Sequence, residues 1–120
     1  MAKRVLIVED EPNIVESLRF LLEREGLDIV VQSDGAQAIE AVQKAQPDLV
    51  ILDIMLPNRS GFDILRDLHT LPGTRPKVMM LTAKGQEKDR LTAEEIGVEL
   101  FMTKPFSNKE IVSNILGLLA

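Results

Sequence analysis

The stretch Leu49-Val50-Ile51-Leu52-Asp53-Ile54-Met55-Leu56-Pro57 decides the fold of this chain. Its first four residues are consecutive aliphatics, a pattern typical of a strand that is buried on both faces. Asp53 follows at the point where this strand would leave the sheet. In an open parallel sheet, ligands and chemistry gather at the carboxyl ends of the strands. Asp is also a common turn residue, so Asp53 by itself supports a structural role as well as a functional one.

The composition excludes several classes of function. The chain has 120 residues, enough for one domain with a core, and we expect a single domain over residues 1–120. The net charge of −5 argues against direct nucleic-acid binding, which needs clustered Lys and Arg. The absence of cysteine excludes disulfides and thiol chemistry. No apolar run is long enough for a signal peptide or a membrane span, which favours a cytoplasmic location without membrane binding.

Apolar runs and helical periodicity alternate five times along the chain. Strands are expected at 5–8, 29–31, 49–52, 78–81 and 100–102. Helices are expected from Pro12 to a C-cap at Gly26, around 38–45, after an N-cap at Ser60, at 87–96 and at 108–119. The helix at 87–96 has few strong apolar positions, so we expect it to be the least firmly packed. The single histidine, His69, is expected to be exposed.

This alternation predicts an α/β fold with a parallel sheet that is covered by helices on both faces. The first, third and fourth strands are the most continuously apolar and should be central, whereas the second and fifth should form the edges. The order 2-1-3-4-5 satisfies this condition and is the flavodoxin-like, doubly wound arrangement. Its topological switch point lies between the first and third strands, which end at Asp10 and Asp53.

Polar side chains follow four strands of the predicted sheet: Asp10, Asp53, Thr82 and Lys104. Glu9, Asp10 and Asp53 would repel one another by roughly 1–4 kcal/mol per pair, and carboxylate oxygens without His or Cys point to Mg²⁺ as the relieving cation. A carboxylate can attack phosphorus and form an acyl phosphate. Mg²⁺, Lys104 and Thr82 would then surround the phosphoryl oxygens. Because no strong general base is placed for hydrolysis, a slowly decaying acyl phosphate would serve as a signal.

The chain resembles the receiver domains of bacterial two-component response regulators over essentially its whole length. The resemblance implies a phosphorylation-dependent switch that accepts a phosphoryl group from a sensor histidine kinase or a phosphotransfer protein. It also implies control of a downstream protein or an output domain, and no enzymatic activity beyond the chain's own phosphoryl transfer and slow autodephosphorylation. The matching residues stand in the family's order and spacing: Val5–Glu11, Asp48–Pro57, Ser60–Phe62, Met80–Ala83 and Phe101–Phe106.

The resemblance also implies roles in the phosphoryl chemistry. Asp53 would be the phosphoacceptor, and Lys104 would contact the phosphoryl oxygens. Thr82 would move toward the phosphoryl group while Phe101 swings inward, although Phe101 also fits a plain core position. The peptide bond between Lys104 and Pro105 is expected to be cis, which is otherwise a minority state before proline.

For the metal, the resemblance implies that Asp10 is the direct Mg²⁺ ligand, together with Asp53. Glu9 would act through water, and the backbone carbonyl of Met55 would complete the protein ligands. In the family, the positions of Met55 and Lys84 tune the lifetime of the phosphoryl group, and a small residue such as Ala83 leaves the site accessible.

Two departures from the family concern oligomeric state. Many DNA-binding regulators carry two Asp residues where this chain has Glu99-Leu100, and the last helix lacks the Arg residues of their dimer interface. We therefore expect either a monomer or a phosphorylation-dependent dimer through the fourth helix, fifth strand and fifth helix. No output domain is present in residues 1–120, so the chain is a stand-alone regulator or part of a longer protein.

Three alternatives stay open at this stage. A phosphatase with an aspartyl-phosphate intermediate would need an acid–base group two residues after Asp53, where Met55 stands. A flavin carrier would need a phosphate loop rich in Ser, Thr or Gly after the first strand, where this chain has Glu9–Pro12. A degenerate receiver would be a protein-interaction module that needs no phosphorylation, and the retained acidic, Thr and Lys positions argue against it.

The apolar residues of the last helix predict a partner surface. At about 100° per residue they fill an arc of roughly 160°, which is wider than one buried stripe needs. Some of this surface should therefore be exposed, and exposed apolar patches usually mark partner sites. We expect a phosphoryl mimic to alter residues 83–119 more than the first two helices.

Overall fold

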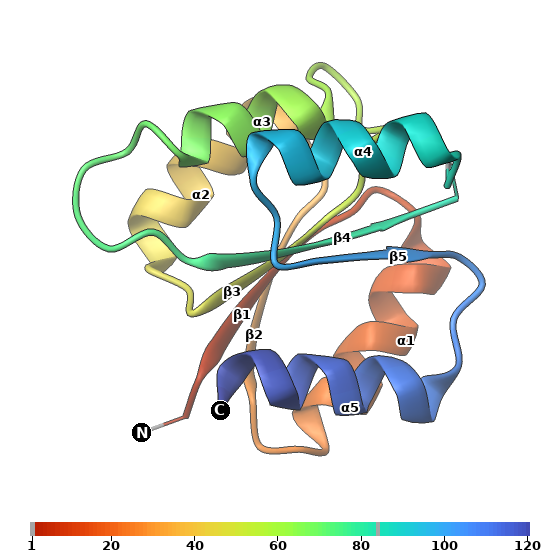
Figure 1. Cartoon of the computed structure of the whole chain (residues 1–120). Coiled ribbons are helices and arrows are strands. Elements are labelled where there is room, and N and C mark those ends of the chain that lie inside the picture. Colours follow the sequence, from red (N-terminus) through yellow and green to blue (C-terminus); the bar gives the residue numbers. More distant parts are fainter. Residues whose placement is uncertain (1, 84) are drawn as a thin grey trace.

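The computed structural model describes residues 2–83 and 85–120. A parallel five-stranded sheet forms the centre of the molecule (Figure 1), in the predicted order β2-β1-β3-β4-β5. All four neighbouring strand pairs are parallel. The flavodoxin-like prediction is thereby confirmed. The strands are β1 (Arg4–Val8), β2 (Asp28–Gln32), β3 (Leu49–Leu52), β4 (Lys77–Thr82) and β5 (Leu100–Thr103).

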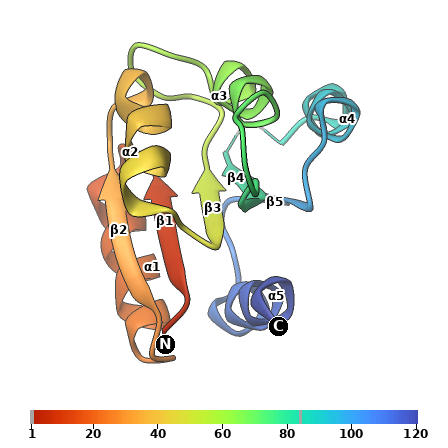
Figure 2. The same cartoon turned by 90° about the vertical axis from the view of Figure 1, so that its left-hand side faces the viewer.

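Helices cover both faces of the sheet, as the alternating pattern predicts. α1 and α5 lie on one face, and α2, α3 and α4 lie on the other (Figures 1 and 2). The helices are α1 (Pro12–Glu23), α2 (Ala38–Ala45), α3 (Gly61–Leu68), α4 (Glu87–Ile96) and α5 (Asn108–Leu119), with a short 3₁₀ helix η1 (Gly35–Gln37) before α2.

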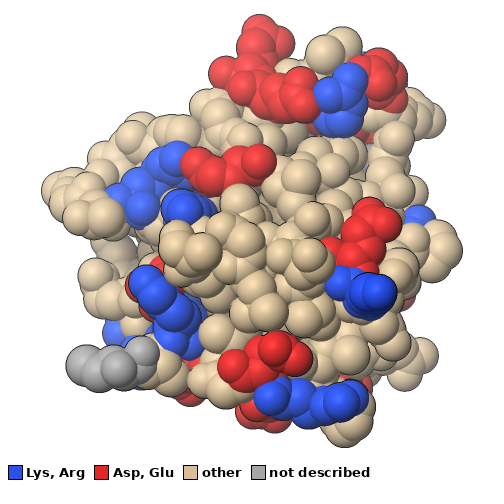
Figure 3. Space-filling view, turned by 60° about the horizontal axis from the view of Figure 1, so that its bottom comes forward, with Lys and Arg blue, Asp and Glu red and all other residues tan. Residues whose placement is uncertain are grey.

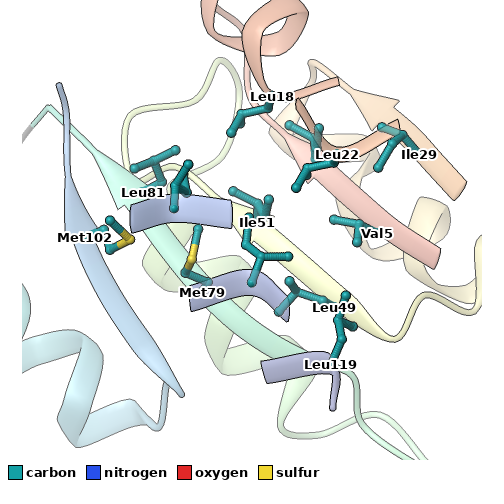
Figure 4. Packing of buried hydrophobic residues seen from close by; sticks show 13 residues of the cluster. Val5, Leu18, Leu22, Ile29, Leu49, Ile51, Met79, Leu81, Met102 and Leu119 are labelled. Atoms are coloured by element: carbon teal, nitrogen blue, oxygen red, sulfur yellow. The ribbon is translucent and has the colours of Figure 1, made fainter. Parts of the chain in front are cut away.

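Alternate side chains of the central strands point into two separate cores, because successive residues of a strand face opposite sides of the sheet. One core packs the sheet against α1 and α5 and is shown in Figure 4. The other packs it against α2, α3 and α4. In β3, Leu49 and Ile51 enter the first core, whereas Val50 and Leu52 enter the second. Burial on both sides explains why the central strands are continuously apolar.

Local differences from the predicted boundaries occur at helix ends. The hydrogen bonding of α1 ends at Glu23, and Gly26 closes the following turn with φ +81° while the Leu27 amide donates to the Leu22 carbonyl. The 3₁₀ helix η1 begins at Gly35, where the Asp34 side chain accepts a hydrogen bond from the Ala36 amide. Ser60 caps α3 as predicted, accepting a hydrogen bond from the Phe62 amide at 3.1 Å.

α4 is held to the molecule by little apolar surface. Its two buried residues are Asp89 and Ala93. One carboxylate oxygen of Asp89 is buried with no hydrogen-bond partner among the residues that the structure describes. This agrees with the expectation of a weakly packed fourth helix. His69 is exposed as expected, and its Nε2 lies 2.8 Å from the carbonyl oxygen of Gly97 at the end of α4.

None of the helices described here combines the length and the apolar composition that a membrane crossing would require.

Candidate functional site

The candidate site residues are held at the ends of the strands by one further backbone hydrogen bond each. The amide of Glu9 donates to Gln32, that of Asp53 donates to Val8, and that of Lys104 donates to Thr82. The parallel ladder therefore continues one residue beyond the regular strands. This fixes the backbones of Glu9, Asp53 and Lys104 at a single edge of the sheet.

The loop after β3 returns close beneath Asp53 because a glycine begins α3. The Gly61 amide donates to the Ile54 carbonyl at 2.8 Å, and a Cβ at position 61 would overlap the backbone carbonyl of Asp53. Only glycine lacks a Cβ and permits this approach. Gly61 therefore helps to position the backbone of Asp53, and with it the Asp53 carboxylate.

The ammonium group of Lys104 lies among three carboxylates. Its Nζ is 2.8 Å from Glu9 Oε1, 3.1 Å from Asp53 Oδ2 and 3.1 Å from Glu11 Oε1. The Lys104 side chain is only 8% exposed. The other Asp53 oxygen accepts a hydrogen bond of 2.7 Å from the Ile54 amide. Both oxygens of Asp53 are thus held in fixed directions.

Burial and charge change the proton affinities at this site. Burial raises the pKa of Glu9 above its ordinary value, and the nearby charge of Asp53 adds to this, although the hydrogen bond from Lys104 opposes it. Burial alone would lower the pKa of Lys104, but the hydrogen bonds and charges of Glu9 and Asp53 outweigh burial and raise it. Lys104 is therefore fully charged at neutral pH.

An unbalanced negative charge remains around this lysine. Glu9, Asp10 and Asp53 each offer an oxygen, and these oxygens lie within 4.8 Å of one another. Together with Glu11, four carboxylates of the described residues gather at this edge of the sheet, and three of them contact Lys104. Asp10 is exposed, whereas Glu9 and Asp53 are buried. Close carboxylate oxygens without His or Cys suit Mg²⁺, so the side chains present fit the predicted metal.

A pocket of about 800 Å³ opens above Asp10 and Asp53. Thr82 lies fully buried at its wall, and Met55 lies at its mouth with 63% of its surface exposed. The pocket therefore brings four of the predicted residues together around one opening, and Lys104 contacts one of them, Asp53.

Phe101 lies outside the pocket that contains Asp10 and Asp53. It is half-buried against the core beneath α4 and borders a separate hollow of about 310 Å³ that also contacts Arg90 and Glu110. The predicted cis peptide bond between Lys104 and Pro105 is present. Lys84, for which an effect on phosphoryl lifetime was considered, lies outside the described residues.

The structure adds two contributors that the sequence interpretation did not single out. Glu11 contacts Lys104, and Thr103 lines the pocket beside Gly85, where any Cβ would overlap the Thr103 side chain. Glu11 directly follows Glu9-Asp10, so its place in that acidic run was an available signal. The packing of Gly85 on Thr103 has no signal in the local sequence pattern.

These features define a class of protein: an α/β domain of flavodoxin-like fold with an acidic pocket at the switch point of its sheet. The chain belongs to the response regulator receiver domain family, whose model matches residues 5–116. The predicted resemblance is confirmed. Domains of this family are phosphorylation-dependent switches in two-component signalling and are not enzymes in the usual sense.

Individual relatives agree with this assignment. The chain is 39% identical over 119 residues to the alkaline phosphatase synthesis transcriptional regulatory protein PhoP of Bacillus subtilis (strain 168), covering 99% of this chain and 49% of that protein. The chain thus spans about half the length of this curated relative.

Solved structures show the same fold. The BeF3-activated N-terminal receiver domain of Klebsiella pneumoniae RstA superposes with a TM-score of 0.91 at 26% identity, over 98% of each chain. A CheY-like response regulator receiver domain protein from Methanospirillum hungatei JF-1 also gives 0.91 at 26% identity, over 99% of this chain and 94% of the other.

Proposed function

We propose that this chain accepts a phosphoryl group on Asp53 from a sensor histidine kinase or a phosphotransfer protein, and that this modification controls a partner. The observation that carries the proposal is the contact of 3.1 Å between Lys104 Nζ and Oδ2 of Asp53, which lines a pocket together with Asp10. Family membership supplies the class of reaction.

In the proposed reaction, an oxygen of Asp53 forms a bond to the phosphorus while the bond from phosphorus to the donor's imidazole nitrogen breaks. The bonding electrons leave with the nitrogen. The carboxylate loses its own charge, and the new negative charge lies on the phosphoryl oxygens. Lys104, already 3.1 Å from Asp53 Oδ2, is placed to follow this charge outward. Thr82 at the wall of the pocket offers a hydroxyl as a further donor.

A bound Mg²⁺ would neutralise charge on the transferring phosphoryl oxygens. We assign Asp10, Asp53 and the backbone carbonyl of Met55 as its direct ligands and Glu9 as a partner through water. Glu9 is the least accessible of these carboxylates and is already paired with Lys104 at 2.8 Å. This geometry supports an indirect role for Glu9 and a direct role for the exposed Asp10.

We infer that the acyl phosphate decays slowly. Met55, two residues after Asp53, has no titratable group. Glu9 and Glu11 are paired with Lys104, and Asp10 is assigned to the metal. An attacking water therefore finds little general-base assistance. Autodephosphorylation would be an intrinsic property of the modified chain and would set how long the signal lasts.

We further propose that residues 1–120 form one receiver unit, whose signal leaves through α4, β5 and α5. α4 buries no large apolar side chain, and Phe101 of β5 is only half-buried, so both can move at moderate cost. The similar PhoP is named a transcriptional regulatory protein. A downstream protein or an output domain is therefore the partner we assign to this surface, which would also serve a phosphorylation-dependent dimer.

Incubation with a small acyl phosphate and Mg²⁺, followed by intact mass spectrometry, tests the acceptor. The wild-type chain should gain one phosphoryl group, and Asp53→Ala should gain none because the attacking oxygen is missing. Uptake by Asp53→Ala at the wild-type level would show that the acceptor is a different residue.

Asp10→Asn tests the metal assignment in the same assay. It removes one charged oxygen from the site while keeping the size of the side chain, so phosphorylation should slow by roughly 100-fold, within the range seen when a catalytic electrostatic contact is lost. Equal phosphorylation rates for Asp10→Asn and wild type, with and without Mg²⁺, would show that the metal assignment is wrong.

A further inference from the structure

Met55 is held at the mouth of the acidic pocket by neighbours that are anchored in a core. Ile54 is buried and Leu56 is partly buried, and both belong to the core between the sheet and α2, α3 and α4. The Gly61 amide also donates to the Ile54 carbonyl at 2.8 Å. The Met55 side chain is nevertheless 63% exposed and lines the pocket together with Asp53. Its thioether is therefore open to solvent at a fixed place near the proposed phosphoacceptor.

The other methionines that the structure describes are shielded from solvent. Met79 and Met80 of β4 are fully buried, and Met102 of β5 is only 8% exposed. The chain contains no cysteine. Because peroxides oxidise thiols and thioethers, Met55 is the one accessible sulfur among residues 2–83 and 85–120.

Exposed apolar side chains elsewhere contain no sulfur. The side of the molecule on which α1 and α5 lie has uncharged surface between charged groups (Figure 3). The large apolar side chains exposed on these two helices are Phe20 and Leu116, and the one exposed on α4 is Leu91. All three are hydrocarbons, which mild peroxide leaves unchanged. Reactivity toward peroxide on the described surface is therefore concentrated at the mouth of the pocket.

We propose that Met55 is a site of oxidative modification by peroxide, and that its sulfoxide shortens the lifetime of the acyl phosphate on Asp53. This role of Met55 rests on the proposed function, because the sulfoxide acts on a phosphorylated Asp53. It gives the chain an input that the phosphoryl donor does not supply, since an oxidant would end the signal while the donor is unchanged.

The modification is a transfer of one oxygen atom. The lone pair of the Met55 sulfur forms a bond to one oxygen of hydrogen peroxide while the bond between the two oxygens breaks. The second oxygen leaves as hydroxide and takes the proton from the new S–OH group, which gives the sulfoxide and water. Sulfur is oxidised by two electrons and peroxide is reduced by two. Methionine sulfoxide reductases reverse this step with electrons from thiols.

The sulfoxide changes what an attacking water meets in the pocket. A thioether is a weak hydrogen-bond acceptor, whereas the sulfoxide is polar and its oxygen accepts hydrogen bonds well. A water that approaches the phosphorus through this pocket would donate to that oxygen, which supplies part of the assistance that the reduced chain lacks. One such hydrogen bond should shorten the phosphoryl half-life by roughly 2- to 10-fold.

Peptide mapping by mass spectrometry after treatment with dilute hydrogen peroxide tests the selectivity. In the folded chain, Met55 should gain one oxygen atom well before Met79, Met80 and Met102. In urea, where burial is lost, the four methionines should react at similar rates. Oxidation of Met79 or Met80 as fast as Met55 in the folded chain would overturn the assignment of the site. This readout does not require phosphorylation.

The lifetime is measured by phosphorylating the reduced and the oxidised chain with a small acyl phosphate and Mg²⁺, removing the donor, and following the loss of the phosphoryl group by intact mass spectrometry. The oxidised chain should lose it faster by the factor given above. Treatment with a methionine sulfoxide reductase and a dithiol should restore the original half-life. Equal half-lives, or a longer one after oxidation, would overturn the inference and leave the proposed function intact. A chain that takes up no phosphoryl group in either state would instead contradict the proposed function, and the inference with it.

Two variants assign the effect to the sulfur. Met55→Leu removes the sulfur and keeps an apolar side chain of similar volume, so its half-life should be the same before and after peroxide. Met55→Gln places an amide oxygen at this position, and its half-life without peroxide should be shorter than that of Met55→Leu. A peroxide effect that persists in Met55→Leu would assign the change to another residue and would overturn the proposal.

Discussion

At the scale of the residue, single charged groups connect segments that are far apart in the sequence. Lys104 joins the end of β5 to carboxylates that follow β1 and β3. Glu99 does the same at the opposite end of β5, where its Oε1 accepts from the Val78 amide at 2.7 Å and its Oε2 accepts from Arg75 at 3.0 Å. The contacts of Lys104 belong to the candidate functional site, whereas those of Glu99 have a structural role.

Glu99 contributes to the free energy of unfolding by an amount that depends on pH. Partial burial would raise its pKa, but the Val78 amide and Arg75 outweigh burial and lower the pKa below its ordinary value of 4.5. A lowered carboxyl pKa stabilises the fold above 4.5, and this contribution is lost as the pH falls through the folded-state pKa. Glu99→Gln should therefore lower the free energy of unfolding by about 1–2 kcal/mol at neutral pH.

Urea titrations from neutral pH to pH 3 would measure this difference. It should shrink as the pH falls, because the wild-type carboxylate becomes protonated and resembles the amide. Glu95→Gln, at an exposed position of α4, serves as the control and should show little difference at any pH. If the free energies of unfolding of Glu99→Gln and wild type differ by the same amount at every pH, the ionic explanation is contradicted.

At the scale of the element, two glycines at helix positions have opposite roles. Gly61 begins α3 against the backbone of Asp53, whereas Gly117 lies inside α5 with no atom within 4 Å of an added Cβ. Gly61→Ala should lower the free energy of unfolding by about 1–3 kcal/mol, because backbone atoms must move apart. Gly117→Ala should raise it by about 0.5–1 kcal/mol, because alanine favours the helix.

Chemical denaturation of the two variants, with phosphorylation rates in parallel, would check this pair. Gly61→Ala should also slow phosphorylation, since the displaced carbonyl belongs to the acceptor residue itself. Gly117→Ala should phosphorylate at the wild-type rate. Similar stability changes for both variants would contradict the close approach at Gly61.

The elements themselves were largely predictable because their signals are local. α4 and α5 begin and end at the residues that the sequence pattern predicts, Glu87–Ile96 and Asn108–Leu119, and the apolar content of the strands gave their order. Residues after the strands identified the cluster of Asp10, Asp53 and Lys104, because parallel strands bring their carboxyl ends to one edge.

Features that depend on packing between distant segments were not predictable. The burial of Asp89 in α4 arises from how that helix lies on the sheet, and a charged residue in a weakly apolar helix gives no sign of it. For α5, the wide apolar arc correctly indicated exposed apolar surface, but not the neighbour that this surface faces. Which neighbour Leu116 faces depends on the placement of α1, and the structure places it in a groove between α1 and α5.

At the scale of the whole molecule, the proposed output surface includes elements from both faces of the sheet, because α4 lies on one face and α5 on the other. α4 and β5 lie next to the acidic pocket through Thr82 and Lys104, whereas α1 and α5 enclose the other core. Converting a population from mostly inactive to mostly active takes about 5 kcal/mol of differential stabilisation. New charge on Asp53, acting through Lys104 and Thr82, would have to supply this bias to α4, β5 and α5.

Amide hydrogen exchange with and without beryllofluoride, in the presence of Mg²⁺, tests the proposed switch most directly. Exchange should change in residues 85–119, above all in α4 and around Phe101, and far less in α1 and α2. Asp53→Ala should show no response, because the mimic has no carboxylate to bind. A response confined to the loops around Asp10 and Asp53, with α4 and Phe101 unchanged, would contradict the account.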